Sequence, residues 1–199
     1  MGLVKVFLGS FIAAVGIVIF IETNQGVDPL GVFYQGIINQ TGDFLGASTF
    51  GTVSATFGFL ILLIAFLLDP KRIGIGSWIV SVFIGIFINL VYSMNLHLFV
   101  PEVAILNLFA GPIVIGIGAA IHLSADLGAG PIEALMLTFS ERTGVGIKYV
   151  RIGLDASFVG VGLLLGAAFG WGIVTGVLLI GPTIEYTLKL LNRRNRKAK

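Results

Sequence analysis

The chain has 199 residues, of which 56% are hydrophobic and 11% are charged, and its formal net charge is +2. Soluble domains carry about 25% charged residues, so this composition excludes an ordinary soluble protein and indicates an integral membrane protein. The chain contains no cysteine, which excludes disulfides and thiol chemistry.

Six apolar runs are each long enough to cross a hydrocarbon core about 30 Å thick, which takes about 20 helical residues. The runs are continuous and do not alternate between apolar and polar residues, which favours a helical bundle over a β-barrel. The expected spans are residues 3–21, 48–68, 73–95, 103–123, 150–169 and 172–191.

A short, broken segment follows the first span and reads GVDPLGVFYQGIINQTG from Gly26. Pro29 suits the first helical position, where its missing N–H costs nothing, and Gly42 suits the helix end. The sequence therefore predicts a short helix over 29–41 whose apolar start is buried. A re-entrant half-helix is favoured, and an amphipathic helix in the membrane interface stays open as an alternative.

The same pattern returns 102 residues later as GAGPIEALMLTFSERTG from Gly128, and the stretch from Gly170 matches the one from Gly74 at an offset of 96. The chain therefore contains two copies of one unit, which is a span, a short helix and two further spans. The matched glycines include Gly9 with Gly111, Gly16 with Gly118, and Gly85 with Gly181. Because each unit crosses an odd number of times, the predicted fold is an all-α integral membrane protein of six transmembrane helices in two inverted three-span repeats. The repeats occupy 1–100 and 101–192 of one membrane domain, and a basic tail covers 193–199.

The basic residues support this topology because it places them on one side of the membrane. The side expected to be cytoplasmic holds Lys5, Lys71, Arg72, Arg142, Lys148, Arg151 and the tail, and residues 22–47 on the other side include no Lys or Arg. The alternative with eight crossings would put Lys71 and Arg72 outside. It would also require residues 29–41 to span the membrane, although as a helix they reach only about 20 Å.

Helix starts and ionisable residues inside such a bundle are candidates for a solute or ion pathway, because polar groups are expensive in hydrocarbon. Helix N-termini carry free N–H groups and partial positive charge. Broken segments at corresponding positions of inverted repeats indicate a transporter site. The candidate pathway residues are Gly26, Asp28, Pro29, Asn89, Gly128, Gly130, Pro131, Glu133, Asp155 and Glu185.

Several of these residues also have a structural interpretation. Asp28 suits the N-cap of the first short helix. Arg151 and Asp155 have i,i+4 spacing, and so do Glu185 and Lys189. The charges of each pair can neutralise each other on a helix face, while the basic side chain reaches toward the membrane interface. His122 is expected to be a packed or interfacial residue rather than a proton relay.

Two positions of the short helices differ between the copies. The first copy has Asp28 and Gly31, whereas the second has Gly130 and Glu133. Any selectivity between solutes is expected to reside at these positions.

The stretches LGAGPIEALMLTFSERTGVGIKYVRIGLD and GWGIVTGVLLIGPTIEY resemble the second half of the YczE/YitT group of bacterial integral membrane proteins. The positions that carry the resemblance are Gly128, Gly130, Pro131, Arg142, Thr143, Gly144, Gly181, Pro182 and Glu185. The first copy departs from this pattern at Asp28, Ile86 and Asn89. The resemblance implies a multi-pass protein of the bacterial inner membrane, here with both termini cytoplasmic.

The expected function is a small secondary transporter or permease that moves a small solute or ion between the two repeats, with proton coupling left open. The alternatives are a passive channel, a lipid-translocating protein, and a non-catalytic membrane partner or regulatory protein. Neither the His-Glu-x-x-His nor the Gly-x-Ser-x-Gly motif is present, so we expect no enzyme, cofactor or metal site. The lipid bilayer is the expected partner, nucleic acid is not, and glycine-lined faces allow a homodimer.

Overall fold

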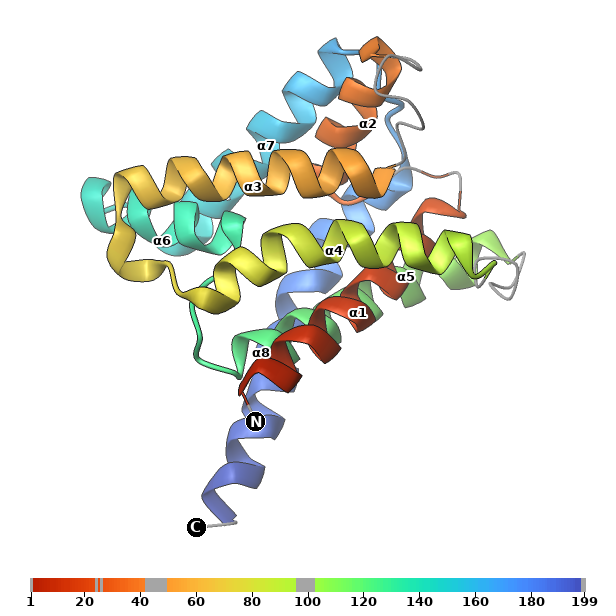
Figure 1. Ribbon diagram of the computed structural model, residues 1–199. Coiled ribbons are helices and arrows are strands. Elements are labelled where there is room, and N and C mark those ends of the chain that lie inside the picture. The colour runs from red at the N-terminus through yellow and green to blue at the C-terminus, as the bar shows by residue number, and fades with distance from the viewer. Residues whose placement is uncertain (1, 24, 26, 42–49, 96–102, 198–199) are drawn as a thin grey trace.

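The computed structural model describes residues 2–23, 25, 27–41, 50–95 and 103–197, and the regular structure among them is helical (Figure 1). A 3-10 turn, η2 (Pro70–Arg72), joins two of the helices. The helices are α1 (Gly2–Ile21), α2 (Pro29–Thr41), α3 (Phe50–Leu68), α4 (Ile75–Ser93), α5 (Ala104–Leu123), α6 (Pro131–Thr143), α7 (Ile147–Leu164) and α8 (Trp171–Lys197). We call α1–α4 the first half and α5–α8 the second half.

Within the described part of the chain, five helices are long and apolar enough to cross a membrane: α1, α3, α4, α5 and, over Trp171–Leu191, α8. They lie where five of the six expected spans were predicted. The remaining expected span, 150–169, falls on α7, which ends earlier at Leu164 and contains Lys148, Arg151 and Asp155. With three charged residues, α7 is not one of these five apolar helices, so a sixth span stays a prediction.

α1 and α5 share the most extensive contact among the described helices, and glycines bring their backbones together. A Cβ added at Gly9 would lie 2.6 Å from the carbonyl oxygen of Gly118, and one at Gly16 would lie 3.0 Å from that of Gly111. The two helices are therefore antiparallel, because later positions on α1 meet earlier positions on α5. Since Gly9 is matched in sequence with Gly111 and Gly16 with Gly118, the contact is reciprocal, as in a two-fold interface.

The other helix pairs also correspond between the halves. The α1–α4 contact matches α5–α8, the contact of α2 with α7 matches that of α6 with α3, and α2–α3 matches α6–α7. Two pairs break the correspondence. A small contact between α2 and α8 has no equal between α6 and α4, and α3 packs along α4 whereas α7 and α8 make almost no contact within the described residues. α2 and α7 instead run side by side, away from the α1–α5 pair (Figure 1).

The loop between α5 and α6 packs against the start of α4. The Gly76 N–H donates to the Leu127 carbonyl at 2.8 Å. Gly128 has φ +114°, and a Cβ there would lie 2.4 Å from the Gly74 nitrogen, so conformation and space both require glycine. Gly128 therefore serves the packing of this end of the molecule.

The end of α2 is attached to the C-terminus of α7. Asn39 Nδ2 donates to the Gly166 carbonyl at 2.7 Å, and Gln40 Nε2 donates to the Leu165 carbonyl at 3.0 Å. These amides satisfy carbonyls that a helix end leaves without partners. We call this contact the amide clasp.

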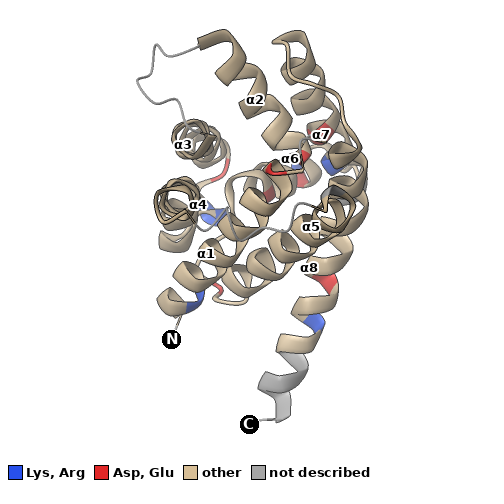
Figure 2. Ribbon diagram, turned by 90° about the vertical axis from the view of Figure 1, so that its right-hand side faces the viewer, with Lys and Arg blue, Asp and Glu red and all other residues tan. Residues whose placement is uncertain are grey.

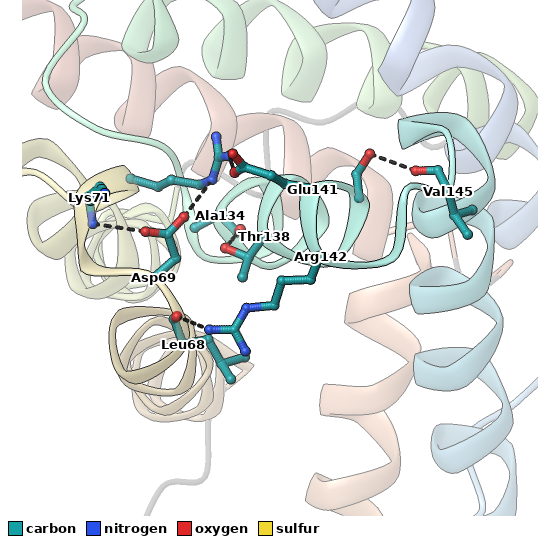
Figure 3. Close-up of polar contacts among 10 residues, drawn as sticks. Leu68, Asp69, Lys71, Ala134, Thr138, Glu141, Arg142 and Val145 are labelled. Carbon is teal, nitrogen blue, oxygen red and sulfur yellow. Dashed lines mark hydrogen bonds and ion pairs between the residues drawn. The ribbon is translucent and has the colours of Figure 1, made fainter.

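The end of α6 is attached to the C-terminus of α3 by residues 102 positions later in the sequence. Arg142 donates to the Leu68 carbonyl and Glu141 pairs with Arg72 (Figure 3). We call this contact the ionic clasp. It lies at the end of the molecule that also holds the α3–α4 turn, so Arg72 and Arg142 share one end.

Candidate functional site

A cavity of about 150 Å³ lies where the starts of α2 and α6 meet. Each of the eight helices, or the turn before it, contributes to the wall, and the greater part of the wall is apolar. The ionisable and hydroxyl side chains on the wall are Asp28, Tyr34, Ser54, Ser81, His122, Glu133 and Arg151.

The short helices begin as the sequence predicted. Pro29 and Pro131 are the first residues of α2 and α6, and both first turns include buried residues. Gly144 ends α6 in the left-handed conformation with φ +70°, whereas Gly42 lies outside the described residues. The apolar starts are therefore the buried ends, and Pro131 itself lines the cavity.

The starts of α2 and α6 each carry one carboxylate, but at different sequence positions. Asp28 comes just before α2, and Glu133 lies within the first turn of α6. Asp28 caps α2, because the N–H groups of Leu30 and Gly31 donate to its carboxylate, and a Cβ at Gly31 would lie 2.8 Å from Asp28 Oδ1. In α6, the carboxylate belongs to Glu133 at the third helical position, and a Cβ at Gly130 would lie 2.4 Å from Glu133 Oε2. In each helix the glycine leaves room for the carboxylate, so the two starts are chemically more alike than the sequence difference suggests.

Asp28 lies between α1 and α2, outside the helices that can span the membrane. Burial raises the pKa of its carboxyl from 3.8 to about 6, while Arg151 acts to lower the pKa and Asp155 to raise it. Asp28 lines the cavity and is half-buried by area. Burial therefore raises the pKa of Asp28 by more than the positive charge of Arg151 lowers it.

Arg151 reaches the cavity wall from α7. Its Nε donates to both carboxylate oxygens of Asp155, at 3.0 and 2.9 Å, which confirms the predicted i,i+4 pair. Arg151 lines the cavity, and its reach toward the membrane interface stays a prediction. Asp28 and Glu133 also act on it electrostatically, and acidic and basic positions of α6 and α7 lie close together in Figure 2.

His122 and Tyr34 are cavity residues that the sequence did not single out as such. His122 is 6% exposed and lines the wall, and a Cβ at Gly130 would lie 3.9 Å from its Cε1, so its ring lies near Glu133. Tyr34 is hydrogen-bonded to Ser54 across α2 and α3. His122 is packed, as expected, but it is packed against the cavity.

Two further candidates lie away from the cavity wall. Asn89 Nδ2 donates to the Thr52 hydroxyl at 3.2 Å and joins α4 to α3. Glu185 is exposed on α8, where it pairs with Lys189. Gly26 lies outside the described residues. Of the ten predicted residues, Asp28, Pro131 and Glu133 line the cavity, and Pro29, Gly130 and Asp155 support those that do.

Comparison with known proteins identifies the family. Residues 2–189 match a family described as a family of unknown function, DUF6198. The chain belongs to this family. It is 28% identical over 183 residues to the uncharacterized membrane protein YczE of Bacillus subtilis, covering 92% of this chain and 83% of that protein. It is 27% identical over 186 residues to an uncharacterized protein of Haemophilus influenzae, covering 92% and 81% respectively. No solved structure gives a significant match. The resemblance to the YczE group is confirmed, and the family is one of membrane proteins.

Proposed function

We propose that the protein is a small secondary transporter or permease of the bacterial inner membrane that carries a small solute through the cavity. The observation that supports this most is a cavity where two short helices start, with charged side chains from both halves on its wall. Charged groups inside apolar bundles are expensive and mark pathways, and helix starts that meet between repeats are typical of transporter sites. Neither a chemical step nor a cofactor is part of the proposal.

The proposed topology has two inverted repeats, with α2 and α6 entering the bundle as re-entrant helices and both chain termini in the cytoplasm. The antiparallel, reciprocal contact of α1 with α5 supports inversion, and the basic residues gathered at one end support the orientation. α7 is then the sixth span. Its central charges, Arg151 and Asp155, neutralise each other beside the cavity and are thereby kept out of the lipid.

Single cysteines test whether the cavity is open to both sides, since the native chain has none. Ser54→Cys and Ala119→Cys place a thiol on the wall in the first and second halves. Small, membrane-impermeant methanethiosulfonate reagents should reach both from either side, in right-side-out and inverted vesicles. Ile64→Cys, on the exposed outer face of α3, is the control that should stay unlabelled. Labelling of neither cavity position would contradict a pathway and favour a regulatory membrane partner.

Proteoliposomes distinguish a secondary transporter from a passive channel. A transporter should accumulate its solute above the outside concentration when a proton gradient is imposed. Equilibration without accumulation would favour the passive channel.

A further inference from the structure

The groups around the cavity carry more negative than positive charge. Asp28 and Glu133 lie on the wall, Asp155 lies behind it, and all three act on the guanidinium of Arg151. Asp155 already occupies the Nε of that guanidinium with both carboxylate oxygens. Buried charge is costly unless an opposite charge compensates it, so the cavity favours an additional cation over an anion.

His122 is a second and independent indication of a ligand. It is 6% exposed and lines the cavity, Glu133 acts on it electrostatically, and the hydrogen bonds found among the described residues do not include one from its ring. Buried polar side chains normally have a hydrogen-bond partner. A neutral imidazole offers a lone pair to an N–H donor, so an ammonium group beside Glu133 would supply the missing partner.

The size and remaining wall of the cavity limit the cation. A cavity of about 150 Å³ admits a molecule about the size of benzene. Tyr34 and Phe50 lie on the wall with their ring centroids 5.8 Å apart in an edge-to-face arrangement, and aromatic rings attract organic cations. The apolar residues of the wall suit an alkyl group.

Resting on the proposed function, we infer that the cavity binds a small organic monocation of the alkylammonium type. Its nitrogen lies among Asp28, Glu133 and His122, and its alkyl group lies against the apolar wall and the ring of Tyr34. This assigns the substrate class of the proposed pathway.

Three molecules of matched shape test the charge of the ligand. Butylammonium, butanol and butyrate are titrated by calorimetry into the full-length protein in detergent micelles, with empty micelles as the blank. Butylammonium should bind at least about tenfold more tightly than the other two, because its charge-assisted hydrogen bonds have no equivalent in them. Equal or tighter binding of butyrate or butanol, or no binding of butylammonium, would overturn the proposal.

Variants of the two wall carboxylates test the location. Glu133→Gln and Asp28→Asn should each weaken butylammonium binding by about tenfold or more. Asparagine also caps helices, so Asp28→Asn should retain the start of α2, which size-exclusion chromatography and circular dichroism would check. Glu22→Gln is the matched control, because Glu22 is an exposed acid bonded to Tyr92 away from the cavity. Unchanged affinity in both wall variants, or an equal loss in the control, would overturn the assignment.

The two proposals fail in different ways. Butylammonium that binds but is not taken up by proteoliposomes would retain the ligand class and remove transport. Uptake of an anion or neutral solute without cation binding would retain transport and remove the ligand class.

Discussion

The α3–α4 pair and its counterpart α7–α8 contain matched glycines but pack differently. A Cβ at Gly85 would lie 2.2 Å from the Gly51 carbonyl oxygen and 2.6 Å from the Ala55 Cβ, so α4 fits tightly on α3. At Gly181, the matched position of α8, the described residues place no atom within 4 Å of the same added group, apart from the neighbouring backbone of α8 itself. Leu178, beside it on α8, is 63% exposed. A small-residue face therefore shows where a helix is able to pack, and the rest of the bundle decides whether it does.

Apart from a small α2–α8 contact, the other helix pairs correspond between the halves, so the open α7–α8 pair is a second arrangement of the same parts. Transporters with inverted repeats move one element against the rest around a fixed site. Under the proposed function, the packed α3–α4 pair and the separated α7–α8 pair would be two conformations of the same unit. Each half would adopt both conformations in turn during transport.

The largest difference in stability is expected when a larger side chain replaces each of the matched glycines, Gly85 and Gly181. Gly85→Leu should destabilise the protein by about 3 kcal/mol or more, because the new side chain meets the backbone of α3. Gly181→Leu should change stability by less than about 0.5 kcal/mol. Thermal unfolding in micelles measures both. A large loss in Gly181→Leu would show that α8 is covered, by α7 in another state or by a second copy of the chain.

A smaller effect is expected where α1 crosses α5. A Cβ at Gly118 would lie 2.4 Å from the Ala13 nitrogen, so Gly118→Ala should cost about 1–3 kcal/mol by overpacking. Gly153→Ala on α7 adds the same methyl group where no atom lies within 4 Å. The same unfolding measurement should leave that variant at or slightly above wild type, and similar losses in both would contradict the difference in packing.

The smallest effects concern the two clasps. Gln40→Ala removes a hydrogen bond of the amide clasp and Arg142→Ala one of the ionic clasp, so each should cost about 1 kcal/mol. Glu141→Gln should destabilise the protein at low salt and approach wild type at high salt, because the ion pair with Arg72 is exposed and screened. The destabilisation of Gln40→Ala should be the same at low and high salt, because the amide clasp contains no ion pair. If salt changed the destabilisation of both variants equally, the two clasps would not differ in charge.

Local signals in the sequence were enough to predict most of the helices. Pro29 and Pro131 begin the short helices at the predicted residues, because proline fixes the backbone at a helix start. Apolar length located α1, α3, α4, α5 and α8. The end of α7 was not predicted, because Gly166 and its apolar neighbours read as a continuing span, whereas the helix stops at Leu164 and Gly166 takes φ +87°.

The cavity was predicted in part. Asp28 and Glu133 were identified because they lie at helix starts, which sequence shows directly. His122, Tyr34 and Arg151 were not assigned to it, because their meeting depends on how all eight helices pack. Glu185 was selected for its depth in a span, but sequence does not fix which face of α8 it occupies.

The reciprocal contact between α1 and α5 has an evolutionary consequence. In each helix, the glycine near the start meets the glycine near the end of its antiparallel partner, and the same two positions serve both helices. Two identical chains can form such an interface if they insert in opposite orientations. A gene that encoded one half alone would thus already specify the central crossing, and its duplication and fusion would fix the two orientations in a single polypeptide.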